Sequence, residues 1–168
     1  LRDRQVEVWH RRLPLMVPPE IPMKAVVRLE SDGSELPLIK DASARIDYIA
    51  RELDAVQLDF DARESQLGWY RELIRSLREP TNDTFVRRQR IVSITALATW
   101  CMQPQPWFQS KPSDLEEVVP MLFRMGPQRV ELLTEIARRR DFAEGCRGTI
   151  GVSIDEPLPW YPPARRVY

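Results

Sequence analysis

Residues that could do chemistry are few in this chain and lie far apart. The 168 residues include one histidine and two cysteines. His10 follows Glu7 at the Glu-x-x-His spacing that binds iron in helical di-iron proteins, but such a site needs a second pair. A single histidine also argues against Ser-His-Asp and Cys-His catalysis. We therefore expect no catalytic residue, no metal and no cofactor; these residues favour a non-enzymatic protein but leave the question of an enzyme open.

The two cysteines indicate a compartment rather than a reaction. Cys101 and Cys146 lie too far apart for a metal-binding or redox motif. We expect free thiols in a reducing, intracellular compartment, and both an organelle and a virion would agree with this. The longest apolar run, Ile91–Met102, is shorter than the roughly 18 residues that cross a bilayer, so we expect no membrane span.

An arginine cluster is the strongest candidate binding site. Arg87, Arg88 and Arg90 fall in the first turns of a predicted helix, where positive charge opposes the helix dipole. Salt bridges to Asp83, to Glu79 or to an acid on the preceding helix would offset this. A phosphate bound at the helix N-terminus would do the same. The three arginines are therefore a candidate anion-binding site.

An acidic stretch has a simpler interpretation. Asp54, Asp59, Asp61 and Glu64 lie within one predicted helix. Asp54 and Asp61 share a position away from its apolar seam, and too few acids project together to form a Mg²⁺ or Ca²⁺ site. We expect these carboxylates to be solvated or to form salt bridges.

One long helix is predicted to organise the fold. From Ile46 to Leu77, apolar residues recur at alternating spacings of three and four, interrupted only by Arg63, as in a heptad seam. A second helix, Phe85–Met102, is apolar almost all round in its second half and is expected to pack antiparallel on the first. The expected fold class is mainly α, a helical bundle built on this pair.

Smaller elements complete the expected architecture. A β-hairpin over 25–39 around the Asp-Gly turn, and a strand over 149–154, would form a small sheet at one end. Helices over 115–123 and 130–143 would close the bundle. The expected organisation is an N-terminal helix and proline-rich arm (1–24), a helical domain with the hairpin (25–156) and a C-terminal proline-rich arm (157–168).

Charge and aromatic residues suggest which partners to expect. Acids and bases balance at 25 each, so the chain lacks the basic excess of a nucleic-acid-binding protein. Proline-rich segments carry large aromatics that gain little from folding alone but can wrap a partner. The candidate partner-binding residues are Trp107, Phe108, Trp160 and Tyr161. We expect a non-enzymatic interaction or structural subunit that docks on other protein chains, as a hetero- or homo-oligomer, through the long seam and the arms.

One resemblance supplies an alternative. The opening Leu1-Arg-Asp-Arg-Gln-Val-Glu-Val-Trp9 resembles the Arg-Gln-x-x-Trp opening of phage-type MazG-like nucleotide pyrophosphohydrolases, which are all-α. Gly68-Trp69 with the following helix, and then 88–100, are similar in rhythm to two core helices of that family. Those helices bind Mg²⁺ through acids, whereas the matching positions here hold Arg75, Ser76 and Arg90, with only Glu79 acidic. The resemblance implies an all-α nucleotide- or small-ligand-binding domain that has lost its metal-binding acids.

Overall fold

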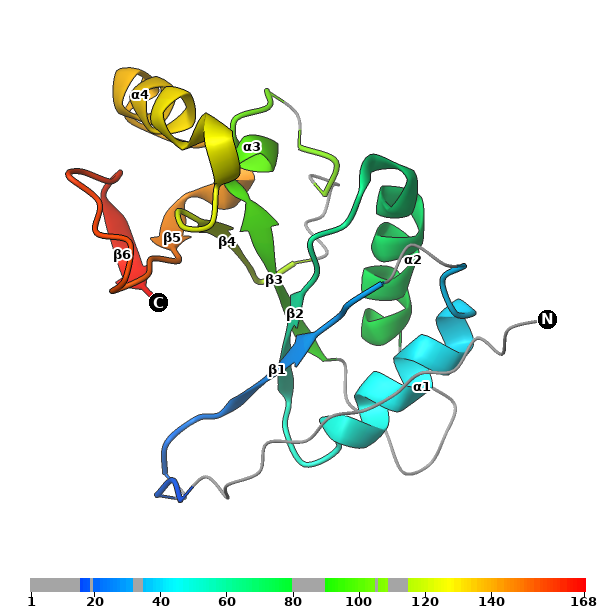
Figure 1. The fold of residues 1–168 in the computed structure, drawn as a ribbon. Coiled ribbons are helices and arrows are strands. Elements are labelled where there is room, and N and C mark those ends of the chain that lie inside the picture. Colours follow the sequence, from blue (N-terminus) through cyan, green and yellow to red (C-terminus); the bar gives the residue numbers. More distant parts are fainter. Residues whose placement is uncertain (1–15, 19, 32–34, 80–89, 105, 109–114) are drawn as a thin grey trace.

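The structure is a computed structural model that describes residues 16–18, 20–31, 35–79, 90–104, 106–108 and 115–168. Strands and short helices alternate along these residues (Figure 1). The strands are β1 (Lys24–Arg28), β2 (Ala55–Asp59), β3 (Ile91–Leu97), β4 (Glu117–Met121), β5 (Gly148–Ile150) and β6 (Ala164–Val167). The α-helices are α1 (Ile39–Ile49), α2 (Leu67–Arg78), α3 (Ala98–Cys101) and α4 (Arg129–Arg139), and the 3-10 helices are η1 (Glu64–Gln66), η2 (Gly126–Gln128) and η3 (Glu144–Cys146). The fold is α/β, so the expected mainly α bundle is wrong.

The strands form parallel sheets in which neighbours in sequence are neighbours in space. Strands β1 to β4 pair in consecutive order, and β5 pairs with β6. A parallel bridge between Met121 and Gly151 joins the second pair to the end of β4. Because parallel crossovers are right-handed, consecutive order places the connecting helices on one face. This winding is that of (β/α) barrels, whereas the strand order reverses in doubly wound sheets.

The two faces of the four-stranded sheet differ in polarity. Val56 pairs with Val92 and Leu58 with Ile94, and all four side chains are buried in the core that the helices cover. Side chains of the intervening positions point to the opposite face, because direction alternates along a strand. That second face carries polar residues in register across three strands, namely Gln57, Ser93 and Glu117.

Helices α1 and α2 cover the apolar face of the sheet. They lie side by side in Figure 1 and contact each other. Helix α2 buries residues at the three- and four-residue spacing of a single helix face, namely Tyr70, Leu73, Ile74 and Leu77. Helix α1 contributes Ala42 and Ile46 to the same core. This apolar layer holds the strands in place and leaves their carboxyl ends accessible.

The predicted long helix is replaced by four elements. Residues 46–77 contain the end of α1, strand β2, η1 and α2. The sequence nevertheless shows a heptad-like pattern, because β2 alternates apolar and polar residues. The spacing of Val56 and Phe60 agrees with the period of two of a strand and also with a heptad. Both side chains are buried in the core, so the seam is not a surface that could dock a partner.

Three further predicted elements are also wrong. Residues 91–102 form β3 and the single turn α3 rather than a helix, and 115–123 contain β4. A short, largely apolar strand cannot be distinguished from a buried helix segment by its periodicity alone. Strand β1 pairs in parallel with β2 and not in a hairpin, and residues 35–38 are not a strand. The expected turn at 32–34 lies outside the described residues, as do 1–12 and 85–89.

Two predicted elements are confirmed near the C-terminus. The predicted helix over 130–143 corresponds to α4, and the predicted strand over 149–154 overlaps β5. Arg138 and Arg139 lie in the last turn of α4, as expected from the helix dipole. Residues 164–168 are not a free arm, because β6 pairs with β5 and the backbone N–H of Tyr168 donates to the carbonyl of Ile150 at 2.9 Å.

A disulfide replaces the expected free thiols. Cys101 in α3 is bonded to Cys146 in η3, and both residues are fully buried. The bond joins the segment that follows β3 to the segment that precedes β5. In the part of the chain that the structure describes, no helix has both the length and the apolar character needed to cross a membrane.

Candidate ligand site at the carboxyl edge of the sheet

Polar side chains gather at the carboxyl ends of β1 and β2. Arg28 is the last residue of β1 and Asp59 the last residue of β2, and the two are register partners. In parallel α/β folds the carboxyl edge of the strands is where ligands bind, because the loops that follow the strands meet there. This edge is therefore a candidate location for a ligand site.

Asp59 is held rigidly at this edge. One carboxylate oxygen accepts a hydrogen bond from Thr95 Oγ1 at 2.6 Å, and the other accepts one from Arg28 Nη1 at 3.0 Å. The side chain is only 16% exposed. Held from two strands, this carboxylate is a fixed hydrogen-bond acceptor.

Asp61, two residues further on, is more open. Its side chain is 55% exposed and its carboxylate lies 4.0 Å from Arg28 Nη2. Arg28 also donates to Glu30 at 2.8 Å. The hydrogen bond to Glu30, together with the charge of Asp59, raises the pKa of Arg28. One guanidinium thus serves three carboxylates, and Asp61 is the least tightly paired of them.

The carboxylates also affect a buried tyrosine behind the sheet edge. Tyr70 is fully buried and its hydroxyl donates to the carbonyl of Leu58 at 3.3 Å. Burial, reinforced by the charges of Asp59 and Asp61, raises the pKa of Tyr70 well above its ordinary value. Tyr70 therefore remains a neutral, structural side chain and takes no part in proton transfer near neutral pH.

The turn after β4 adds a cation in an unusual backbone conformation. Arg124 has a φ of 53°, in the left-handed region that costs a non-glycine residue about 1–2 kcal/mol. Its backbone N–H donates to both carboxylate oxygens of Glu156, at 3.2 and 3.1 Å. Strained residues of this kind cluster at functional sites, and here the Glu156 carboxylate stabilises the strained turn.

These segments line an open cavity. Its volume is about 280 Å³, close to the lower end of the range for small-molecule sites. Its polar lining comes from the ends of all four strands, namely Arg28, Asp59, Asp61, Thr99 and Arg124. The remaining lining residues are apolar, namely Leu97, Ala98, Met121, Phe123, Met125 and Leu132.

The arrangement is better suited to binding than to acid–base catalysis. Carboxylate pairs that cleave glycosidic bonds flank the bond from opposite sides. The lining carboxylates come from one segment, since Asp59 ends β2 and Asp61 follows it, and both face Arg28. Among the described residues, no cluster of three or more His, Cys, Asp or Glu could hold a metal ion.

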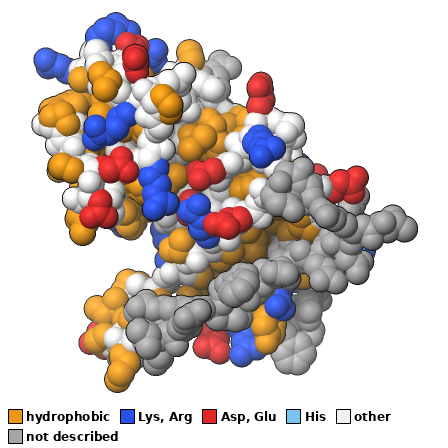
Figure 2. All heavy atoms as spheres, in the orientation of Figure 1, with side chains coloured by type: hydrophobic (Ala, Val, Ile, Leu, Met, Phe, Trp, Pro, Cys, Tyr) orange, Lys and Arg blue, Asp and Glu red, His pale blue; other side chains and the backbone are white. Residues whose placement is uncertain are grey.

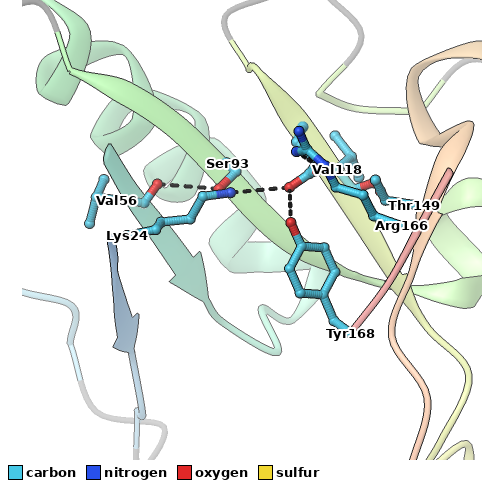
Figure 3. Close-up of polar contacts among 8 residues, drawn as sticks. Lys24, Val56, Ser93, Val118, Thr149, Arg166 and Tyr168 are labelled. Atoms are coloured by element: carbon cyan, nitrogen blue, oxygen red, sulfur yellow. Dashed lines mark hydrogen bonds and ion pairs between the residues drawn. The ribbon is translucent and has the colours of Figure 1, made fainter. Parts of the chain in front are cut away.

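A second polar cluster ties the sheet together at its opposite, amino end (Figure 3). Glu117, at the start of β4, accepts hydrogen bonds from Lys24 at 3.1 Å, Arg166 at 3.2 Å and Tyr168 at 2.9 Å. Burial alone would raise the pKa of Glu117, but the hydrogen bonds from Lys24 and Tyr168 outweigh it and lower the pKa. The carboxylate is fully occupied, so we interpret this cluster as structural.

The predicted anion site is only partly within the described residues. Arg87 and Arg88 lie outside them. Arg90 is buried at the amino end of β3, where its Nε donates to Asp47 at 2.5 Å. It also donates to three carbonyls, those of Asp47, Ala50 and Leu53. Its guanidinium is therefore used to fasten α1 and the following turn to β3.

The four predicted partner-binding aromatics separate into two pairs. Trp107 and Phe108 contact each other, with ring centroids 5.3 Å apart, and pack in the core, where Phe108 is buried. Trp160 and Tyr161 remain 40% and 44% exposed. Of the four, Trp160 and Tyr161 are therefore the ones accessible to a partner.

The residues that form the cavity were missed by sequence reasoning. Asp59 and Asp61 were assigned to a solvated helix face, and Arg28 and Arg124 were not singled out. A signal was present, because Val56-Gln-Leu-Asp-Phe-Asp61 alternates apolar and polar residues like a strand that ends in carboxylates. The heptad spacing of the longer window concealed it.

Comparisons of the chain with models of protein families, with curated proteins and with solved structures find no match. The all-α fold implied by the MazG-like resemblance is contradicted by the parallel sheet. The fold places the chain in a structural class, a singly wound parallel α/β domain, with a cavity at the carboxyl edge of its sheet.

Proposed function

We propose that this protein binds a small, polar organic molecule in the cavity at the carboxyl edge of β1–β4. The observation that carries the proposal is the convergence of five polar residues from the ends of four consecutive strands on one cavity with an apolar wall. Few convergent polar groups within an apolar lining are typical of small-molecule sites. The polar groups would fix the orientation of the ligand, and the apolar wall would supply contact area.

Ligand-observed NMR with a library of sugars, amino acids, carboxylic acids and nucleosides tests this proposal. Thr99 is exposed and lines the cavity, so Thr99→Trp should fill the cavity without disturbing the core. At least one compound class should give saturation-transfer signals that Thr99→Trp abolishes. Val130→Trp is the matched control, because Val130 is 70% exposed on α4 and does not line the cavity. Identical signals in all three proteins, or none in any, would refute the proposal.

A second proposal is that the protein also docks on other protein chains as an interaction subunit. It no longer includes a helical seam, since residues 46–77 form four separate elements and not one helix. It is supported by exposed apolar side chains near the C-terminus, namely Ile154, Trp160, Tyr161, Val167 and Tyr168. Exposed aromatics of this kind are common anchors of interfaces. An intracellular, reducing location is no longer proposed, since the buried disulfide favours an oxidising compartment.

Native mass separates the docking proposal from a monomer. Light scattering after size exclusion should give a mass above 19.7 kDa, and the double variant Trp160→Ala/Tyr161→Ala should return it to the monomer value. Val130→Ala serves as the control for loss of an exposed apolar residue elsewhere. A monomeric wild type would rule out self-association, and a mass that both variants leave unchanged would remove Trp160 and Tyr161 from the interface.

The surface charge agrees with these proposals and not with nucleic acid as a partner. Figure 2 shows Lys and Arg side chains interspersed with Asp and Glu over the face that it draws. The chain as a whole has a formal net charge of zero. A surface without a basic excess gives little non-specific attraction to phosphate backbones.

A further inference from the structure

We infer that the ligand of the carboxyl-edge cavity is an organic anion with an apolar body, anchored by Arg124. This inference rests on the proposed function and specifies its ligand class. It starts from the distribution of charge and apolar surface within the cavity. Charge and apolar surface are distributed differently on the two sides of the cavity. One side is formed by the ends of β1 and β2, and the other by the end of β4 and the residues that follow it.

The acidic side of the cavity is already partly compensated. Arg28 pairs with Asp59 at 3.0 Å and with Asp61 at 4.0 Å, and Thr95 donates a further hydrogen bond to Asp59. A cationic ligand would have to compete with a guanidinium that is covalently tethered beside these carboxylates. Because Arg28 already occupies Asp59 and lies beside Asp61, a cationic ligand would gain less on this side than at unpaired carboxylates.

The opposite side holds a second cation, Arg124. The Arg124 guanidinium makes no ion pair or hydrogen bond with another described residue, whereas its backbone N–H is held by Glu156. The same segment carries half of the apolar lining residues, namely Met121, Phe123 and Met125, and Leu132 of α4 adds a fourth. A cation beside an apolar wall matches a ligand with a carboxylate, sulfonate or phosphate group on a hydrocarbon body.

Two fluorescent probes of similar shape and different charge test the inference on the full chain. 8-Anilinonaphthalene-1-sulfonate is an organic anion, and N-phenyl-1-naphthylamine is its uncharged counterpart. Arg124→Asn removes the charge but keeps the backbone, because asparagine adopts positive φ more readily than most residues. It should weaken binding of the sulfonate about tenfold, the effect of one charge-assisted hydrogen bond. The uncharged probe should bind within twofold of wild type, and Arg124→Lys should restore most of the sulfonate affinity.

The controls separate failure of this inference from failure of the proposed function. Arg165→Gln removes an exposed arginine that does not line the cavity, and it should change neither affinity. If Thr99→Trp abolishes binding of both probes but Arg124→Asn weakens neither or both equally, the cavity binds ligands and the anion inference is wrong. A cationic naphthylamine that binds more tightly than the sulfonate would also overturn it. If neither probe binds, or Thr99→Trp affects neither, the cavity itself is not a ligand site.

Discussion

Arg90 shows how one buried side chain can determine the position of a helix. Its side chain is 4% exposed and pairs with Asp47 of α1, whose side chain is 17% exposed. Arg90→Leu would leave the Asp47 carboxylate and the carbonyls of Ala50 and Leu53 without their donor. Removing one partner of such a pair costs about 3 kcal/mol. The midpoint of urea unfolding measures this loss.

The matched control for Arg90 is another arginine of the same region. Arg51 pairs with Glu52 at 3.7 Å but is 59% exposed, and exposed pairs contribute little. Arg51→Leu should leave the unfolding midpoint nearly unchanged. A similar midpoint for both variants would show that the contacts of Arg90 do not stabilise the fold.

Glu117 makes stability depend on pH in a definite direction. Its pKa in the folded protein lies below the ordinary 4.5. Above pH 4.5 the carboxylate is ionised in both states and its contribution is complete. As the pH falls below 4.5, the unfolded chain takes up the proton first, so the free energy of unfolding falls. Glu117→Gln should lower this free energy by about 2 kcal/mol at pH 7 and flatten its decline between neutral and acidic pH. Urea titrations at several pH values measure both effects.

Glu135 provides the contrast for that experiment. Hydrogen bonds from Arg138 and Arg139 lower its pKa to about 2, but the carboxylate is at the surface. Salt screens such exposed charges far more than buried ones. Wild type and Glu135→Gln should differ in the pH dependence of their free energy of unfolding at low salt, and this difference should disappear in concentrated salt. The corresponding difference between wild type and Glu117→Gln should persist. Equal sensitivity to salt would mean that Glu117 is not shielded.

At the scale of elements, the disulfide fastens α3 to η3. The two cysteines are separated by 45 residues. Closing a loop of that length lowers the conformational entropy of the unfolded chain, which raises the free energy of unfolding by about 3–4 kcal/mol. Replacing both cysteines by alanine should lower the melting temperature by roughly 10 °C. A thiol assay should detect no free cysteine in the denatured, unreduced protein and two after reduction. Two free thiols without reductant would contradict the bond.

Strand β6 links the end of the chain to the rest of the molecule. Arg166 and Tyr168 bind Glu117, which Lys24 of β1 binds from the other side. A chain that ends at Pro163 would lose these bonds and the pairing with β5, leaving a buried carboxylate with one partner. We expect the free energy of unfolding to fall by about 3 kcal/mol, measured by thermal melting. A melting curve that superimposes on wild type would mean that β6 is dispensable.

Helix α4 and strand β5 were predicted correctly because their signals are local. Gly126-Pro127 precedes the helix, apolar residues recur on one face, and Arg138 and Arg139 complement its C-terminal dipole. These features act within one or two turns, so they can be read without knowing the rest of the fold. The neutral charge and the lack of a membrane-spanning run are likewise properties of composition.

Strands β2, β3 and β4 were mistaken for helices because their conformation depends on distant partners. Val56, Val92 and Val118 are buried between neighbouring strands and covering helices. An apolar segment of that kind satisfies a helix or a strand equally well, and pairing between residues far apart in sequence decides between them.

The sequence gives the types of the residues that line the cavity, but it does not show that they lie close together in the fold. Arg28, Asp59 and Arg124 span almost a hundred positions, and nothing in their spacing connects them. They become neighbours because consecutive parallel strands end at one edge of the sheet. Composition thus determines that the chain can bury a core and that it carries no net charge. Local sequence signals determine the position of helix α4. Strand register, an interaction between distant segments, determines which side chains share a site.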